Sequence, residues 1–273
     1  MDKVKCTARW VLVLALVAAA VPAAAQAPDF VPEVGQPGKD VVWVPSPPET
    51  VEKMMEVGRI TPQDFVIDLG SGDGRNVIAA AKRGARGLGV EYNNDMVELS
   101  KRIASKEGVA ERAQFVQGDM FQADFSKATV LALFLLPSNL LQLRDKIFNL
   151  QPGTRVVLNT FGIQDWTPDE QVTLENCTSW CTVMLNIVPA KVDGTWRLPQ
   201  GELTLTQQYQ MVSGTLKYSD GRTAPVTGRL RGYELTLTGE NQEFKGRVNG
   251  KMFEGTARLG NNQGTTITAT KVN

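Results

Sequence analysis

The stretch that decides the fold reads Val66-Ile67-Asp68-Leu69-Gly70-Ser71-Gly72-Asp73-Gly74-Arg75. An apolar segment with an acidic residue near its end is followed by a loop with glycine at every second position, and this loop leads directly into a helical pattern. Glycine adopts positive φ at little cost and lets a ligand approach the main chain with no Cβ in the way. The stretch therefore predicts a buried strand, a ligand-binding turn and a helix, in that order. A tight turn without a ligand is the alternative.

Apolar strand patterns alternate with helical patterns along this half of the chain. Strands are expected at residues 65–69, 87–91, 113–117, 130–135 and 155–161, and helices at 75–83, 94–106 and 139–149. Either Asn93 or Asn94 is expected to cap the second helix. The alternation predicts a parallel sheet covered by helices on both faces, in which ligands bind at the carboxyl ends of the strands.

The acidic residues around the glycine loop narrow the choice of ligand. Glu91 ends the second expected strand, where nucleotide-binding α/β folds carry the acid that accepts hydrogen bonds from ribose hydroxyls. The G-x-G-x-G spacing differs from the G-x-G-x-x-G of dinucleotide binders, and no Gly-Lys-Ser/Thr follows it. Asp68 and Asp73 would repel a pyrophosphate but suit a ligand with a cationic amine and a sulfonium. The loop therefore favours an adenosyl ligand of that kind.

These residues resemble the first motif of the class I S-adenosylmethionine-dependent methyltransferases, an acidic residue followed by x-G-x-G-x-G. The resemblance extends from about residue 44 to 169 and is strongest to bacterial relatives of the Dot1-like and FAM173-type protein-lysine methyltransferases. Those proteins share the lead-in seen here as Pro45-Ser46-Pro47 and the loop from Asp68 to Arg75. The resemblance implies a Rossmann-like doubly wound sheet with S-adenosylmethionine as co-substrate.

The resemblance also implies which residues hold this methyl donor. In the glycine loop they are Asp68, Gly70, Ser71, Gly72, Asp73 and Gly74. Glu91 would bind the ribose, Asp119 would lie beside the adenine amino group, and Met120 would lie against the adenine ring. Asp119 as an ordinary turn residue at a strand end is the alternative.

Candidate acceptor residues cluster after the fourth and fifth expected strands. They are Leu136, Pro137, Asn139 and Phe161, together with Trp43 in the lead-in and the further aromatic candidate Trp166. Simple packing is the alternative for each aromatic residue, and a helix cap is the alternative for Asn139. Asn159 stands where the relatives commonly carry histidine, which makes the acceptor chemistry less defined than donor binding.

The composition excludes several kinds of chemistry. Histidine is absent, so Ser-His-Asp and Cys-His systems and histidine-ligated metals are excluded, and no metal is predicted. No general base is identified, but methyl transfer from a sulfonium mainly requires alignment and exclusion of water. Lys plus Arg equals Asp plus Glu, at 29 each, and the Asn-Pro-Pro-Tyr motif of nucleic-acid amino-methylases is missing, so nucleic acid is not the expected partner.

The N-terminus predicts export. A basic start, an apolar run at 10–21 and Ala23-Ala24-Ala25 form a signal peptide at 1–25 with cleavage before Gln26. The expected location is the periplasm or the medium, without stable membrane insertion after leader removal, and an uncleaved anchor is the alternative. Export permits a disulfide between Cys177 and Cys181, with two free thiols as the alternative. Because S-adenosylmethionine is made in the cytoplasm, export conflicts with methyl transfer.

Four segments are expected: the leader at 1–25, an extended proline-rich lead-in at 26–48, a Rossmann-like methyltransferase domain at 49–190 and a β-rich domain at 191–273. In the last segment short β patterns are separated by glycine turns, which predicts an antiparallel meander curled into a small barrel or sandwich. A targeting, docking, dimerising or stabilising role is open for it, and no oligomeric state is indicated.

The function expected from the whole chain is methyl transfer from S-adenosylmethionine to a protein lysine or a small amine. A non-catalytic adenosyl-ligand-binding or adaptor protein of the cell envelope is the alternative. An NAD-dependent oxidoreductase is disfavoured by the glycine spacing and by the lack of a suitable acid or base.

Overall fold

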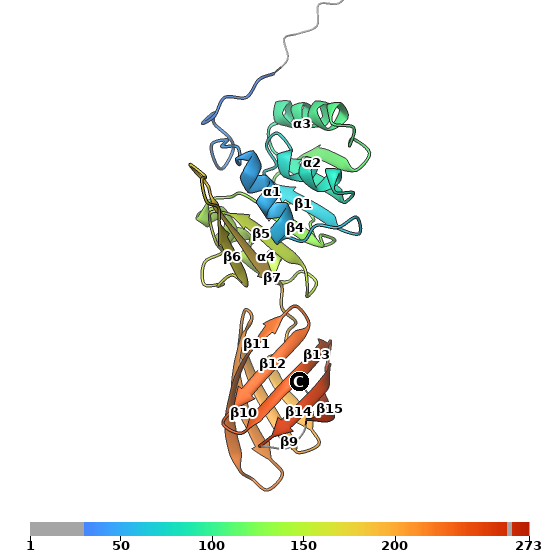
Figure 1. Cartoon of the computed structure of the whole chain (residues 1–273), viewed down its shortest axis with the longest axis vertical. Coiled ribbons are helices and arrows are strands. Elements are labelled where there is room, and N and C mark those ends of the chain that lie inside the picture. The colour runs from blue at the N-terminus through green and yellow to red at the C-terminus, as the bar shows by residue number, and fades with distance from the viewer. Residues whose placement is uncertain (1–29, 261–263, 273) are drawn as a thin grey trace, which may run out of the picture. The chain divides into compact units, whose positions relative to one another are not determined.

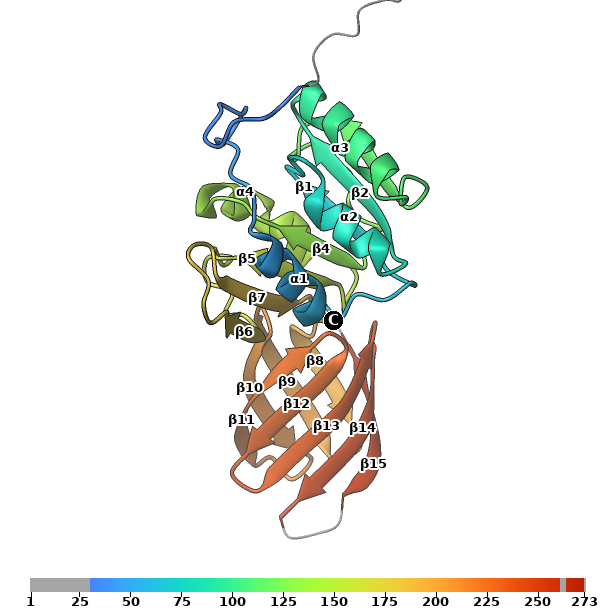
Figure 2. The same cartoon turned by 45° about the horizontal axis from the view of Figure 1, so that its top comes forward.

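The computed structural model describes residues 30–260 and 264–272 (Figure 1, Figure 2). The expected leader lies outside these residues. The compact unit Pro32–Asn273 contains two separate sheets, one with helices packed on it and one closed into a barrel. This confirms the expected fold class. No helix in the described ranges is long and apolar enough to cross a membrane.

The first sheet has the strand order β3-β2-β1-β4-β5-β7-β6. Its strands are β1 (Phe65–Leu69), β2 (Arg86–Glu91), β3 (Ala113–Gln117), β4 (Val130–Leu133), β5 (Arg155–Asn159), β6 (Glu170–Thr173) and β7 (Thr182–Ile187). The first five run parallel, whereas β7 is antiparallel to β5 and to β6. The five strands expected from the sequence are therefore parallel, as predicted, and the antiparallel strands β6 and β7 are additions that the sequence did not predict. A short loop joins β6 to β7 as a hairpin, and two strands joined in this way pair antiparallel.

Within the part of the chain that the structure describes, four helices pack on the sheet: α1 (Pro48–Val57), α2 (Arg75–Lys82), α3 (Asn94–Lys106) and α4 (Pro137–Phe148). Successive side chains of β1 point to opposite faces, and they divide between two cores. Val66 packs in one core with residues of α1 and α2, and Ile67 packs in another with residues of α4. Helices therefore cover both faces of the sheet, as Figure 2 shows.

The helix α1 departs from expectation, because the proline-rich lead-in predicts extended chain up to residue 48. Proline is favoured at the first position of a helix, where its missing N–H costs nothing, and Pro48 begins α1 in this way. Val51, Met54 and Met55 form its buried face. In α3 the cap is Asn93, whose side-chain oxygen accepts hydrogen bonds from the amides of Asp95 at 2.8 Å and Met96 at 3.4 Å.

The second sheet is a closed antiparallel barrel, so the barrel alternative is confirmed over the sandwich. Its strands are β8 (Gly194–Leu198), β9 (Gly201–Gln208), β10 (Met211–Tyr218), β11 (Thr223–Arg231), β12 (Glu234–Gly239), β13 (Gln242–Asn249), β14 (Met252–Leu259) and β15 (Thr265–Lys271). β8 pairs with both β9 and β15, which closes the ring. Trp196, Phe244 and Val248 belong to its buried interior, as alternation along small barrel strands requires.

Candidate functional site

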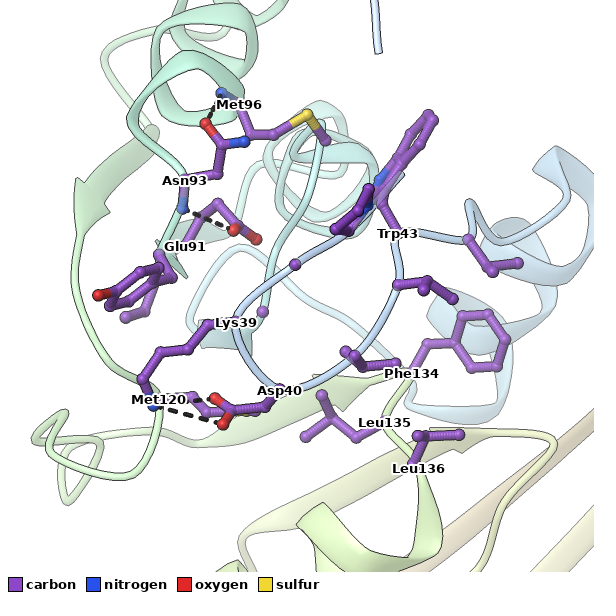
Figure 3. Close-up of a pocket in the computed structure, with 18 of the residues that line it drawn as sticks. Lys39, Asp40, Trp43, Glu91, Asn93, Met96, Met120, Phe134, Leu135 and Leu136 are labelled. Atoms are coloured by element: carbon purple, nitrogen blue, oxygen red, sulfur yellow. Dashed lines mark hydrogen bonds and ion pairs between the residues drawn. The ribbon is translucent and has the colours of Figure 1, made fainter. Parts of the chain in front are cut away.

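A cavity of about 410 Å³ lies at the carboxyl ends of the parallel strands, where the strand order reverses between β1 and β4. Open α/β sheets bind their ligands at this switch point. The walls come from the lead-in Gln36–Val44, from the segments after β2 and β3, and from the segments after β4 and β5. Figure 3 shows Lys39, Asp40 and Trp43 of the lead-in together with Glu91, Met96 and Met120 of the sheet side.

Glu91 connects the glycine loop to the start of α3. One carboxylate oxygen accepts a hydrogen bond from the amide of Gly72 at 2.9 Å. The other accepts one from the amide of Asn93 at 2.9 Å, which Figure 3 shows. A carboxylate has about four lone-pair sites, so each oxygen retains acceptor capacity on the cavity side. Glu91 can thus receive a pair of hydroxyl groups without losing its own contacts.

The glycine loop has positive φ at Gly70 (75°), Gly72 (55°) and Gly74 (81°). Gly70 lines the cavity, and a Cβ at this position would meet nothing nearer than the Cδ2 of Leu135 at 3.4 Å. Space for a ligand therefore exists against the backbone at Gly70. The hydroxyl of Ser71 is buried and has no hydrogen-bond partner among the described residues.

The other loop residues lie beneath or beside the cavity rather than on its wall. Asp73 is held by the guanidinium of Arg75, which donates to the carboxylate at 2.9 Å through Nε and also contacts the carbonyl of Ser46. A Cβ on Gly72 would lie 2.6 Å from the indole nitrogen of Trp43, so this tryptophan packs directly on the loop. At Gly72 the space beside the main chain, which the sequence predicts to receive the ligand, is therefore filled by Trp43 of the lead-in.

Asp68 is buried under the loop and is 3% exposed. Burial raises the pKa of its carboxyl well above the usual range because it disfavours the charged form. The nearby charges of Glu91 and Asp73 raise this pKa further, and a 3.0 Å hydrogen bond from the amide of Asn76 opposes the rise. A cation placed at the loop would favour the ionised form.

Asp119 and Met120 lie at the cavity, as the sequence predicts. One oxygen of Asp119 accepts from the amide of Phe121 at 2.9 Å, and this bond is the first cause of its lowered pKa. The other oxygen lies 3.2 Å from the ammonium of Lys39. That ammonium also lies 5.5 Å from the ring centre of Tyr92. Sequence reasoning missed Lys39 because nothing in the lead-in pattern distinguishes it.

The acceptor candidates divide into two groups. Trp43, Leu136 and Phe161 line the cavity. Pro137 is the first residue of α4, and Asn139 is buried inside that helix, so neither lines the cavity. Asn139 is not the helix cap either, because that position is Leu136. A proline at the first helical position moves the start of the helix ahead of Asn139.

Of the two interpretations of Trp166, packing rather than acceptor contact is the one that the structure confirms. Its side chain is 1% exposed and packs against the rings of Phe148 and Tyr209, at centroid distances of 5.5 and 5.3 Å. A different tryptophan, Trp180, reaches the cavity instead. It belongs to the loop between β6 and β7, in which Cys177 and Cys181 form a disulfide.

Asn159, at the position where the resemblance leads one to expect histidine, donates to the hydroxyl of Ser46 at 2.9 Å. It is buried and serves to fasten the lead-in to β5. Within the described residues no group of three or more Cys, Asp or Glu side chains is arranged to hold a metal ion.

Comparison with known proteins agrees with this geometry. The family model described as the ANTKMT methyltransferase domain matches residues 68–170. A protein-lysine N-methyltransferase of Saccharolobus islandicus is 38% identical over 151 residues, which cover 54% of this chain and 94% of that protein. The adenine nucleotide translocase lysine N-methyltransferase of Mus musculus is 34% identical over 130 residues, which cover 47% of this chain and 56% of that protein.

A solved structure gives the same fold with a ligand. It is an RNA methyltransferase from Salinibacter ruber in complex with S-adenosylhomocysteine, with 44% identity and a TM-score of 0.52, covering 55% of this chain and 96% of that one. Fold, glycine loop and relatives together define a class I S-adenosylmethionine-dependent methyltransferase, with S-adenosylmethionine as methyl donor. The chain belongs to the family of the Saccharolobus protein-lysine N-methyltransferase.

Asp68 is expected to make donor binding depend on pH. The donor's amine and sulfonium are positive, so binding favours the ionised carboxylate and affinity rises as pH increases through the raised pKa. Above this pKa, Asp68→Asn is expected to weaken donor binding about tenfold and to flatten the pH profile. Calorimetric titration with S-adenosylmethionine at several pH values measures both effects. An unchanged profile in the variant would contradict this role.

The raised pKa of Asp68 also determines how the stability of the folded protein changes with pH. Asp68 contributes stability that is fully present below the pKa of the unfolded chain, about 3.9, and that is lost as pH rises through the folded pKa. Thermal unfolding of the ligand-free protein across this window should show the decline. In the Asp68→Asn variant the decline should be absent.

Proposed function

We propose that this protein transfers a methyl group from S-adenosylmethionine to the ε-amine of a lysine in a protein acceptor. The observation that carries the proposal is one cavity that extends from Glu91 and Asp119 to an apolar end bordered by Leu136 and Phe161. The first end suits the ribose and adenine of the donor. The second suits an aliphatic chain that carries an amine.

Chemistry at the apolar end fits an amine acceptor. A lysine must lose a proton before it attacks the methyl group, and desolvation lowers the pKa of an amine. The side chains of Phe134, Leu135, Leu136 and Phe161 provide such surroundings. In-line transfer then depends on alignment and on exclusion of water. The Saccharolobus islandicus and Mus musculus relatives are both lysine N-methyltransferases by name, which supports this acceptor.

RNA is the competing acceptor, because the Salinibacter relative is an RNA methyltransferase. Balanced charge and the missing Asn-Pro-Pro-Tyr motif favour protein over nucleic acid. The test is to incubate the chain from Gln26 onward with methyl-labelled S-adenosylmethionine and, separately, with a cell-envelope protein extract or total RNA. Acid hydrolysis of the protein and nucleoside analysis of the RNA identify the labelled group.

Labelled methyl-lysine that disappears with the Glu91→Ala variant is the expected result. Label in RNA nucleosides alone would overturn the lysine proposal while leaving the methyltransferase activity intact. Absence of label from every pool, with donor binding demonstrated, would overturn the proposed function and favour the adaptor alternative.

We further propose that the protein acts outside the cytoplasm, in the periplasm or the medium, after removal of residues 1–25 and without remaining inserted in the membrane. The Cys177–Cys181 disulfide supports this, because disulfides persist in oxidising compartments. Cell fractionation with thiol alkylation tests it. A mature chain outside the cytoplasm whose Cys177 and Cys181 resist alkylation until reduced is expected, and a full-length cytoplasmic chain with reactive thiols would overturn it.

A further inference from the structure

Three aromatic rings meet at the apolar end of the cavity and form what we term the aromatic wall. The centroids of Phe134 and Phe161 are 6.2 Å apart with nearly parallel planes, and Trp180 lies 5.3 Å from the first ring and 5.9 Å from the second, tilted to both. All three residues line the cavity. Figure 3 shows Phe134 next to Leu135 and Leu136.

The three rings come from distant parts of the chain. Phe134 follows β4, Phe161 follows β5, and Trp180 precedes β7. Because β7 is antiparallel to β5, its beginning lies at the same edge of the sheet as the end of β5. The β6–β7 hairpin, which the sequence did not predict, therefore supplies the third ring.

Trp180 is fixed by its loop rather than by a regular strand. The Cys177–Cys181 disulfide closes the loop with the two Cα atoms 5.7 Å apart, and the amide of Leu174 donates to the carbonyl of Cys181 at 2.9 Å. The carbonyl of Trp180 accepts a 3.1 Å hydrogen bond from the hydroxyl of Thr50. The φ of Trp180 is 58°, in the left-handed region, which a bulky residue adopts only where its surroundings impose it.

The aromatic wall has the chemistry to receive an alkylammonium group. Aromatic faces attract cations through their quadrupole, most strongly at tryptophan, and quaternary ammonium groups are recognised in this way. The three side chains carry no charge, so they hold an ammonium without an ion pair. Phe134 adjoins Leu135, whose Cδ2 is 3.4 Å from the position of a Cβ on Gly70, so the wall begins beside the donor loop.

We propose that Phe134, Phe161 and Trp180 form the acceptor subsite for an alkylammonium group, with Cys177 and Cys181 as positioning residues that hold Trp180 in place. This rests on the proposed methyl transfer to an amine. The lysine enters as an ammonium and gives one proton to water, and the neutral nitrogen then displaces the methyl group from the sulfonium. S-adenosylhomocysteine is the leaving group, and the subsite holds the methylated ammonium that results. The disulfide acts on acceptor binding alone, because the donor contacts lie on Glu91 and the glycine loop.

The test uses choline as a probe, beside its neutral carbon isostere in which a tert-butyl group replaces the trimethylammonium group. The chain from Gln26 onward is saturated with S-adenosylhomocysteine, and each probe is titrated by NMR. The wild-type protein should bind choline about fivefold tighter than the isostere. Trp180→Ala should abolish this preference, and Trp180→Phe, which keeps a ring, should retain most of it.

The disulfide is tested by the Cys177→Ser/Cys181→Ser double variant, which should lose most of the preference for choline while binding S-adenosylhomocysteine as the wild type does. A preference that is absent from the wild type, or that persists in Trp180→Ala, would overturn the subsite. A preference unchanged in the double variant would overturn the positioning role of the cysteines. Failure of the wild-type protein to bind S-adenosylhomocysteine would instead contradict the proposed function. Failure of the subsite proposal and failure of the proposed function are therefore distinguishable.

Discussion

Replacing Glu91 with alanine is expected to weaken the binding of S-adenosylmethionine by about 100-fold. Two ribose hydroxyls would donate to this carboxylate, and hydrogen bonds to a charged group contribute about 1.5–3 kcal/mol each. A loss of about 3 kcal/mol corresponds to about two powers of ten in affinity. Titration calorimetry with S-adenosylmethionine and S-adenosylhomocysteine measures the change.

Glu91→Gln provides the graded comparison. The amide keeps one acceptor oxygen, but its NH₂ group must face the amide of either Gly72 or Asn93, both of which now donate to the carboxylate. An intermediate loss of about tenfold is expected. The matched control is Glu98→Ala, which removes an exposed carboxylate on α3 that pairs with Lys101.

Glu98→Ala should bind the donor as the wild type does. Because Glu91 also accepts two backbone hydrogen bonds, circular dichroism must show that each variant is folded. A folded Glu91→Ala protein with wild-type affinity would contradict the assignment of the donor site.

Replacing Gly74 with alanine is expected to lower the free energy of unfolding by about 3 kcal/mol, from left-handed strain together with overpacking. Gly74 precedes α2 with a φ of 81°. A Cβ there would lie 2.5 Å from the ring of Phe115 and 3.0 Å from the Cβ of Ser100. Strand β3 and helix α3 would both have to shift.

Gly108→Ala separates the two causes. Gly108 has a φ of 69°, but a Cβ at this position would meet nothing within 4 Å. This variant should show the left-handed strain alone, at about 1 kcal/mol. Thermal and urea unfolding of the pair measures the difference, and equal losses in the two variants would show that the contact with Phe115 is relieved without cost.

Much of the parallel part of the fold could be predicted because its signals are local. β1, β3 and α3 have the bounds expected from apolar runs, glycine turns and an asparagine cap. The β6–β7 hairpin could not be predicted in the same way. β6 is mostly exposed, so it lacks the apolar alternation that identifies a strand, and it forms only by pairing with β7.

The residues of the candidate site also divide into those that local sequence signals predict and those that they do not. Glu91 ends a strand of the sheet, and Gly70, Asp119 and Met120 come shortly after strands. Their position at one cavity therefore follows from the topology. Lys39 reaches Asp119 from 80 residues away in the sequence, and no local pattern encodes that contact.

The choice between tryptophans shows the same limit. Trp166 and Trp180 are the same residue type, and no sequence pattern distinguishes them. Trp166 packs in the core, whereas the disulfide loop places Trp180 at the cavity. Sequence patterns place residues on elements, whereas contacts between loops depend on the assembled chain.

Closure of the barrel has a consequence for self-association. Free strand edges can template pairing with another chain, and a closed barrel removes them. Among the described strands of the first sheet, the unpaired edges lie at β3, with five residues, and at β6, with four. Glu170 on β6 is engaged by Arg59 at 2.8 Å, which places opposite charges at that edge. Any edge-to-edge aggregation through the first sheet must therefore start from one of two short strands, and β3 is the less protected of them.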